Sequence, residues 1–153
     1  MPDVCRDLEA VFQQNIPLTE ALAVQVVSWQ QQRLELHLPL AANKNHKNTI
    51  FGGSLYCAAV LAGWGWLHLR LQEAQITDGE VVVHAGDISY PAPADSDIQI
   101  ICEAPAAEQW DKFVKIYQRR GRARINLISQ VFTTDGTLAA ELSGQYVLYK
   151  VSA

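Results

Sequence analysis

The sequence predicts a single α+β domain in which an antiparallel sheet surrounds one long apolar helix. Segments of alternating or β-branched apolar residues, which are typical of strands, lie on both sides of residues 53–73. That segment is apolar on all its faces, as expected of a helix that is covered on nearly every side. Strands grouped around one helix, rather than alternating with several helices, indicate an α+β fold without a parallel core.

The composition supports one globular domain over residues 1–153. No repeat or linker divides the chain, and its 153 residues suit a single domain. With 49% apolar and 18% charged residues the chain is not of the disordered class. The net charge of −4 argues against a protein that binds along duplex DNA, so we expect no nucleic-acid partner.

The cysteines and the N-terminal residues indicate the expected cellular location. Cys5, Cys57 and Cys102 are far apart and odd in number, which disfavours both a disulfide framework and a zinc site. Residues 1–12 carry acidic groups early and lack the apolar core of a signal peptide. We therefore expect a reducing, cytoplasmic location.

The first half is expected to begin with a helix followed by two strands. Residues 3–14 show an apolar stripe at helical spacing after Asp3, which can cap the first turn. Residues 22–30 and 33–40 are predicted strands. In the second of these, leucines alternate with polar residues, which is the pattern of a half-buried strand.

The apolar helix 53–73 raises the question of membrane insertion. Its continuous apolar part runs only from Leu55 to Leu67. This run is shorter than the roughly 18 residues that a spanning helix needs, so we expect a buried helix and no membrane insertion. Because one sheet leaves part of such a helix uncovered, a second copy of the sheet is expected to complete the cover, in a homodimer or a homotetramer built as a dimer of dimers.

The second half is expected to be rich in strands. Gly121 is predicted to end an amphipathic helix, and Thr134-Asp135-Gly136 is typical of a hairpin turn. The predicted elements are strands at 80–90, 97–103, 122–133 and 138–149 and a helix at 107–120.

A polar loop that runs into the start of the apolar helix carries the chemistry. The segment 45–55 reads Asn-His-Lys-Asn-Thr-Ile-Phe-Gly-Gly-Ser-Leu. Gly52 and Gly53 allow a ligand to approach the backbone closely, and the first N–H groups of a helix lack internal partners. A carbonyl oxygen placed there would be polarised as it gains negative charge. The alternative interpretation is that the glycines only allow a sharp turn.

This loop resembles that of the PaaI-like acyl-thioesterases of the hot-dog fold. Their pattern, Asn-x-x-Gly-x-x-His-Gly-Gly, opens the central helix of that fold. Asn45, Gly52 and Gly53 match the pattern. Asn48 stands where the family often has glycine, and Phe51 stands where it has histidine.

A second segment extends the resemblance. Residues 88–93, Ile-Ser-Tyr-Pro-Ala-Pro, followed by Asp97, resemble the family's third strand and its turn. The opening Asn-x-x-Asn-Thr-x-Phe-Gly-Gly-Ser-Leu and the Gly-Trp-Gly of the helix are similar to the YiiD C-terminal thioesterase family. The resemblance covers nearly the whole chain. It implies a hot-dog domain that hydrolyses acyl-CoA or acyl-carrier-protein thioesters.

One departure from the pattern concerns the general base. The PaaI-like enzymes usually carry a carboxylate on the central helix where this chain has Val60, yet attack by water still needs a base or a firm water-positioning group. Asp87 is the first candidate, since it shares a strand face with Ser89, and His46 in the loop is the second. The alternatives are an acid on the outer face of the sheet and a solvated loop histidine.

The remaining assignments concern binding. Asn45 and the Gly53 N–H are expected to polarise the thioester carbonyl, although asparagine in a polar loop is otherwise a turn former. The residues expected to contact substrate are Asn48, Gly52, Ser54, Ser89, Arg119 and Arg122. Because Ser54 has no paired histidine it is a poor nucleophile, and Cys57 is expected to be an inert core residue.

The arginines belong to a basic cluster. Six of the twelve lysines and arginines fall within residues 112–124. Such a cluster suits the phosphates of coenzyme A or the acidic face of an acyl carrier protein. The alternative is a solvated helix face beside a strand edge that the charges protect from aggregation.

Histidines outside the loop point to no metal or other cofactor. His68 and His84 stand alone on apolar elements without a second ligand at metal spacing, and core or interface roles are expected for both.

The sequence thus predicts a thioester hydrolase whose pocket lies between two subunits, with loop 45–53 of one chain facing strand 80–90 of the other. The rival is a non-catalytic acyl-thioester binding or regulatory module that kept the fold and lost the base. A hydratase or dehydratase is a third option, weakened by the lack of an Asp/His pair.

Overall fold

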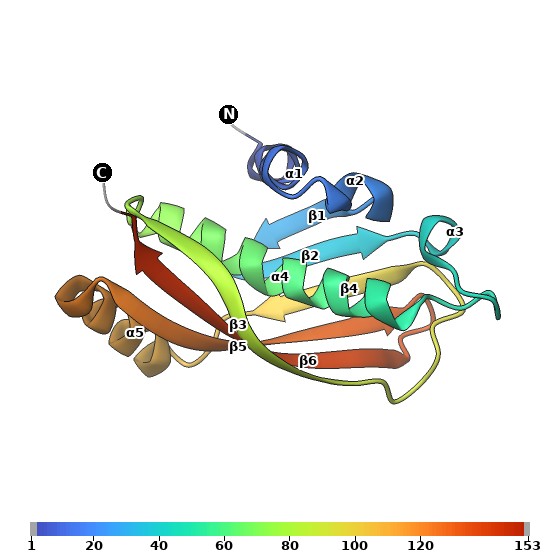
Figure 1. The fold of residues 1–153 in the computed structure, drawn as a ribbon. Helices are drawn as coiled ribbons and strands as arrows, with labels where there is room; N and C mark the ends of the chain where they lie inside the picture. The colour runs from blue at the N-terminus through green and yellow to red at the C-terminus, as the bar shows by residue number, and fades with distance from the viewer. Residues whose placement is uncertain (1–2, 152–153) are drawn as a thin grey trace.

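The computed structural model describes residues 3–151, which form a curved six-stranded sheet with one long helix lying across it (Figure 1). The elements in chain order are α1 (Val4–Asn15), α2 (Leu18–Leu22), β1 (Gln25–Gln30), β2 (Arg33–Leu38), α3 (Leu40–Asn43), α4 (Gly52–Glu73), β3 (Gly79–Ser89), β4 (Ile98–Glu103), α5 (Ala107–Arg120), β5 (Arg122–Thr133) and β6 (Leu138–Lys150).

The sheet is antiparallel throughout, with strand order β1-β2-β4-β5-β6-β3. β1 and β3 are therefore its two edges, at opposite sides of the molecule (Figure 1). The hairpin predicted between β5 and β6 turns at Gly136, whose φ is 87°. The expected antiparallel sheet around an apolar helix is confirmed, and there is no parallel strand pair within the described residues.

Helix α4 is the centre of the core. Leu55, Leu61, Trp66 and Leu67 are buried against the sheet. One stripe of the helix remains only partly covered, as the expectation of a second covering layer requires. This stripe consists of Gly53, Tyr56, Cys57, Val60, Trp64 and His68.

Local signals set the ends of the outer helices. The Asp3 carboxylate accepts hydrogen bonds from the N–H groups of Cys5 and Arg6 at 3.1 and 3.2 Å, so the predicted cap of α1 is confirmed. Helix α5 ends at Gly121, which takes the left-handed conformation with φ 70°. The sequence predicted the Asp3 cap, the helix end at Gly121 and the turn at Gly136, because each of these residues acts on its immediate neighbours in the chain.

Two predicted strand boundaries were wrong. The strand predicted over 22–30 begins at Gln25, because α2 occupies the preceding residues and Ala23 ends it in a left-handed conformation. The strand predicted over 33–40 ends at Leu38, because α3 begins at Leu40. The side chain of Asn43 holds both short helices in place by donating to the carbonyl oxygens of Leu22 and Pro39, each at 2.9 Å.

All three cysteines are free. No helix within residues 3–151 combines the length and the apolarity needed to cross a membrane.

Candidate functional site

The first turn of α4 offers two backbone donors. Gly52 and Gly53 begin the helix, and the next two N–H groups, of Ser54 and Leu55, donate to the carbonyl oxygen of Phe51 at 2.9 and 3.1 Å. The N–H groups of Gly52 and Gly53 have no hydrogen-bond partner among the described residues. They lie at the positive end of a helix of 22 residues, where an oxygen that gains negative charge is stabilised.

Two aromatic side chains frame this helix start. The Tyr90 hydroxyl donates to the carbonyl oxygen of Gly52 at 3.0 Å, which ties the end of β3 to the first turn of α4. The ring of Phe51 covers Gly53 so closely that a Cβ there would overlap it. Gly53 is therefore required for a close approach. Tyr90 lay inside the segment that carried the family resemblance, but the pattern alone assigned it no role.

Asn45 organises the loop that precedes the helix. Its Oδ1 accepts from the N–H groups of Lys47 and Thr49 at 2.9 and 3.2 Å, and its Nδ2 donates to the Thr49 hydroxyl at 2.9 Å. Asn48 takes a positive φ of 60°, which asparagine tolerates. The turn-forming role of Asn45 is thus observed. One of its amide hydrogens has no partner among the described residues, and its contact with a substrate carbonyl stays a prediction.

The structure does not bring Asp87 to the helix start within one chain. Asp87 and Ser89 share a face of β3, as expected. The neighbouring Gly86 faces the helix, because a Cβ there would overlap the Tyr56 hydroxyl, and Ile88 packs on the core. Since side chains alternate along a strand, Asp87 and Ser89 point to the outer face of the sheet. This is the alternative that the sequence left open for Asp87.

The other predicted site residues lie close to the helix start in the chain. His46 is exposed in the loop, whereas Ser54 is buried in the first turn of α4. Val60 lies in the partly covered stripe, and its carbonyl oxygen accepts from the Tyr146 hydroxyl at 3.1 Å. The position that carries an acid in the PaaI-like pattern thus borders the site, but it holds an aliphatic side chain.

Burial raises the pKa of two groups beside the helix start, Cys57 and Tyr90. Burial raises the pKa of the Cys57 thiol, which argues against a nucleophilic thiolate. Burial also raises the pKa of Tyr90, and the nearby Tyr56 and Cys57 add to this shift. Tyr90 is therefore a stable hydrogen-bond donor to Gly52 across the physiological range.

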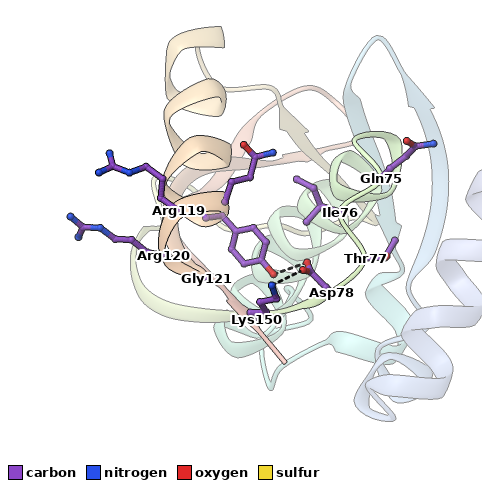
Figure 2. A pocket seen from close by; sticks show the side chains of 10 residues that line it. Gln75, Ile76, Thr77, Asp78, Arg119, Arg120, Gly121 and Lys150 are labelled. Atoms are coloured by element: carbon purple, nitrogen blue, oxygen red, sulfur yellow. Dashed lines mark hydrogen bonds and ion pairs between the residues drawn. The ribbon is translucent and has the colours of Figure 1, made fainter. Parts of the chain in front are cut away.

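A second candidate site lies beyond the opposite end of α4. A cavity of about 680 Å³ is lined there by residues 75–78, 117–121 and Lys150. Figure 2 shows the side chains that line it. The Tyr117 hydroxyl donates to Asp78 at 2.8 Å, and the Lys150 ammonium lies 3.6 Å from the other carboxylate oxygen. The hydrogen bond from Tyr117 is the main cause that lowers the pKa of Asp78, and Lys150 adds to it.

Only one of the two predicted arginines belongs to this cavity. Arg119 and its neighbour Arg120 line it, and their side chains point away from Asp78 (Figure 2). Arg122 is exposed at the start of β5 and does not line it. A helix of 22 residues is about 33 Å long, so the cavity and the helix start of one chain are far apart.

Comparison with known proteins places this geometry in a family. The sequence profile of a family described as "Putative thioesterase (yiiD_Cterm)" matches residues 5–150. The chain belongs to this family. The resemblance read from the loop and from the third strand is thereby confirmed.

Solved structures confirm the hot-dog fold. A protein of unknown function from Chlorobaculum tepidum is 33% identical, with a TM-score of 0.90 over 97% of this chain and 95% of that one. A protein from Shewanella oneidensis that is described as a "putative thioesterase" is 30% identical, with a TM-score of 0.83 over 99% of this chain and 100% of that one. The PaaI protein of the phenylacetic acid degradation operon of E. coli is 12% identical, with a TM-score of 0.66 over 98% and 95%, and shows the shared fold alone.

Proposed function

We propose that this family member hydrolyses acyl thioesters of coenzyme A or of acyl carrier protein. The observation that carries the proposal is the pair of unpartnered N–H groups at Gly52 and Gly53, at the start of a buried helix. Thioester hydrolysis passes through a tetrahedral intermediate whose oxygen carries a negative charge. Backbone donors that are fixed before the reaction stabilise such an oxygen without reorganisation.

The chemistry assigned to the helix start is polarisation of the carbonyl. The thioester oxygen accepts a hydrogen bond from the Gly53 N–H, and the free amide hydrogen of Asn45 is the second donor that we assign. Asn48, Gly52 and Ser54 border the same loop and first turn and contact the substrate. Water attacks the carbonyl carbon and the thiol leaves. A base must take a proton from that water, and Asp87 and His46 are the candidates that the sequence named.

We propose that the protein acts as a homodimer, or as a dimer of dimers, joined through β3. This edge strand has eleven residues, and Val82 and Val83 are 44% and 42% exposed in its centre. Pairing β3 with its copy satisfies the free edge and covers the half-exposed stripe of α4. Loop 45–53 of one chain then faces β3 of the other. The side chain of Ser89 points to the outer face of the sheet, so its contact with the substrate stays a prediction.

Antiparallel pairing also gives a role to the cavity lined by Arg119, Arg120 and Lys150. The cavity lies beside the beginning of β3, whereas the helix start lies beside its end. Two antiparallel copies of β3 therefore bring the cavity of one chain near the helix start of the other. We propose that Arg119, together with Arg120, receives the phosphates of the carrier, and that Arg122 extends this basic surface.

The test is a panel of acyl-CoA substrates assayed with a thiol reagent. We expect Asn45→Ala to lower turnover by about 10²–10³, the usual cost of losing one such donor. Asn126→Ala, on the exposed outer face of β5, is the matched control and should keep full activity. An active wild type whose Asn45→Ala variant is equally active would remove Asn45 from the site.

The rival function is a binding module, and Val60 is the observation that favours it. If the wild type hydrolyses no substrate above the buffer rate yet binds acyl-CoA, the binding module is the correct function. Asp87→Asn and His46→Ala test the base candidates on the best substrate. If neither change lowers kcat tenfold, both assignments fail.

A further inference from the structure

The charge of the molecule is concentrated on α5 and the start of β5. Residues 107–124 carry six basic and two acidic side chains, a net charge of +4, whereas the rest of the chain carries six basic and fourteen acidic side chains, a net charge of −8. The α5 basic surface, as we call it, consists of Lys112, Lys115, Arg119, Arg120, Arg122 and Arg124. Such segregation of charge favours a partner of opposite sign.

The six side chains of this surface are exposed and form no ion pair within residues 3–151. Elsewhere in the chain Arg33, Arg70 and Lys150 each pair with a carboxylate. Like charges that lie together without partners repel one another. Their gathering on one surface is therefore unfavourable until an acidic partner binds there.

Two structural explanations account for only part of this surface. The helix dipole favours basic residues in the last turn of α5, which explains Arg119 and Arg120 but not Lys112, in the second turn. β5 lies between β4 and β6, and α5 packs against β5, whose pairing with β4 ends at Ser129. Protection of a free edge therefore does not explain the charges at the start of β5.

An apolar side chain lies at the centre of the α5 basic surface. Half-buried Ile116 lines two open hollows. The hollow of about 520 Å³ lies among Lys112, Lys115 and Arg119, and that of about 340 Å³ extends from Lys112 to Arg124 on β5. An apolar centre within a charged rim is the usual build of a protein interface.

The extent of this surface suits a protein better than the phosphates of coenzyme A. Lys112 and Arg119 are seven residues apart, about 10 Å along the helix, and Arg124 extends the surface onto β5. Sites for small ligands bury most of the ligand. Here the basic side chains are exposed, and Arg119 and Arg120 point away from Asp78 in the neighbouring cavity (Figure 2).

The interior of that cavity is not built for phosphates. Its ammonium group, of Lys150, lies 3.6 Å from the Asp78 carboxylate. The hydrogen bond from Tyr117 lowers the pKa of Asp78, so the carboxylate keeps its charge at neutral pH and repels an anion. The unpaired cations of α5 are exposed to a partner that approaches from solvent.

We infer that the α5 basic surface is the docking site for the acidic face of acyl carrier protein, so that this carrier, rather than coenzyme A, presents the substrate. The inference rests on the hydrolysis proposed above and needs no particular dimer, because its residues belong to one chain. Carboxylates of the carrier meet the lysines and arginines, and an apolar side chain of the carrier packs on Ile116. Arg119 and Arg120 receive the phosphate of its pantetheine arm.

The first test compares the two carriers loaded with the same acyl group. We expect Lys112→Glu/Lys115→Glu to lower kcat/KM about tenfold or more on acyl carrier protein, because attraction becomes repulsion, and to leave kcat/KM on acyl-CoA unchanged. Lys115→Glu alone has a matched control in Arg6→Glu, an exposed position on α1 with the same change of charge. The control should change neither value.

The second test strengthens the surface. Asp111 borders the same hollow as Lys112, Lys115 and Arg119. Asp111→Lys should therefore raise kcat/KM on acyl carrier protein severalfold at low salt. The gain should vanish towards 1 M salt, where charges are screened beyond about 3 Å.

Each outcome has a definite meaning. If Lys112→Glu/Lys115→Glu affects both carriers equally, or neither, the docking inference is overturned and the proposed hydrolysis stands. If the wild type hydrolyses neither thioester, the proposed hydrolysis fails, and calorimetric titration with holo-acyl carrier protein tests the docking alone. Binding that the double variant loses supports the docking, and no binding overturns it.

A membrane surface is the other acidic partner that the experiment distinguishes. The probe is a vesicle of phosphatidylcholine and phosphatidylserine in equal parts. Wild-type protein that adheres to these vesicles through Lys112 and Lys115, but does not bind acyl carrier protein, would overturn the inference.

Discussion

The two edges of the sheet are built in opposite ways. β1 has six residues and is covered by α1, and the Glu9 carboxylate accepts a hydrogen bond from the edge N–H of Val26 at 3.0 Å. β3 has eleven residues, and no helix of residues 3–151 covers its free edge (Figure 1). Its central valines are exposed beside the half-covered stripe of α4.

Proteins normally protect an edge strand, because a free edge is a template for pairing with another chain. The protection of β1 shows that this chain follows the rule at one edge. The exposed, apolar centre of β3 therefore supports the proposal that this edge pairs with a copy of itself. The four predictions below, from the largest expected effect to the smallest, test this difference.

The largest effect is expected from Val83→Arg. Val83 lies near the centre of β3, so two arginines would meet near the twofold axis and repel each other. We expect the variant to sediment as a monomer at micromolar concentration and to lose at least about a hundredfold in thioester hydrolysis, because in the proposed dimer each site is completed by the partner chain.

Val27→Arg is the matched control for this change. Val27 is the corresponding exposed valine on β1, at 50% exposure against 42% for Val83. It should change neither the sedimentation nor the activity. If the two arginine variants behave alike, the difference between the two edges has no functional meaning.

Gly63→Ala tests the support of β3 from the core. A Cβ at Gly63 would overlap the hydroxyl of Tyr146, which pairs with Val83 across the sheet and bonds to Val60. Overpacking of this kind costs about 1–3 kcal/mol of the free energy of unfolding, which urea titration would measure. Gly52→Ala, where a Cβ makes only ordinary contact with Tyr90, should leave the stability nearly unchanged.

Glu9→Ala tests the protection of β1. The substitution leaves the N–H of Val26 without its carboxylate partner, and a lost hydrogen bond of this kind costs about 1–2 kcal/mol of the free energy of unfolding. Catalytic activity and dimer formation should not change, because this edge lies away from the proposed interface. A loss of the dimer would show that β1, not β3, joins the subunits.

The smallest effect concerns the start of β3. The Tyr117 hydroxyl holds the pKa of Asp78 below its ordinary value, so this bond stabilises the fold at pH values above the unfolded pKa of about 3.8. The contribution is lost as the pH falls through the lower folded pKa. Tyr117→Phe should therefore be slightly less stable than wild type at pH 6, and the difference in melting temperature should vanish towards pH 2. A constant difference at all pH values would contradict this reading of Asp78.

The sequence predicted the elements whose signals are local. The helix 107–120 and the two long strands of the hairpin were predicted at nearly their observed bounds, because periodicity, Gly121 and the turn at 134–136 act within a few residues. The helices α2 and α3 were missed. They are short and depend on Asn43, whose partners lie 21 and four residues away.

The site was predictable only in part. The helix start at Gly52 and Gly53 was visible as a motif, whereas the face of Asp87 was not. The register shift between Val83 and Ala85 leaves His84 as an extra residue. This bulge inverts the alternation, so the side chains that follow it exchange faces. Nothing in the local pattern of β3 reveals this bulge. The hydrogen bond between Tyr90 and Gly52 was equally hidden, because it joins residues that are 38 positions apart in the chain.

The central claim is that one active site needs two chains. Its most direct test is the rate of thiol release per chain, measured on the best acyl-CoA substrate as the protein is diluted through the dissociation of the dimer. The account predicts that this rate falls in proportion to the fraction of dimer determined by sedimentation at the same concentrations. A rate per chain that stays constant while the protein becomes monomeric would contradict it.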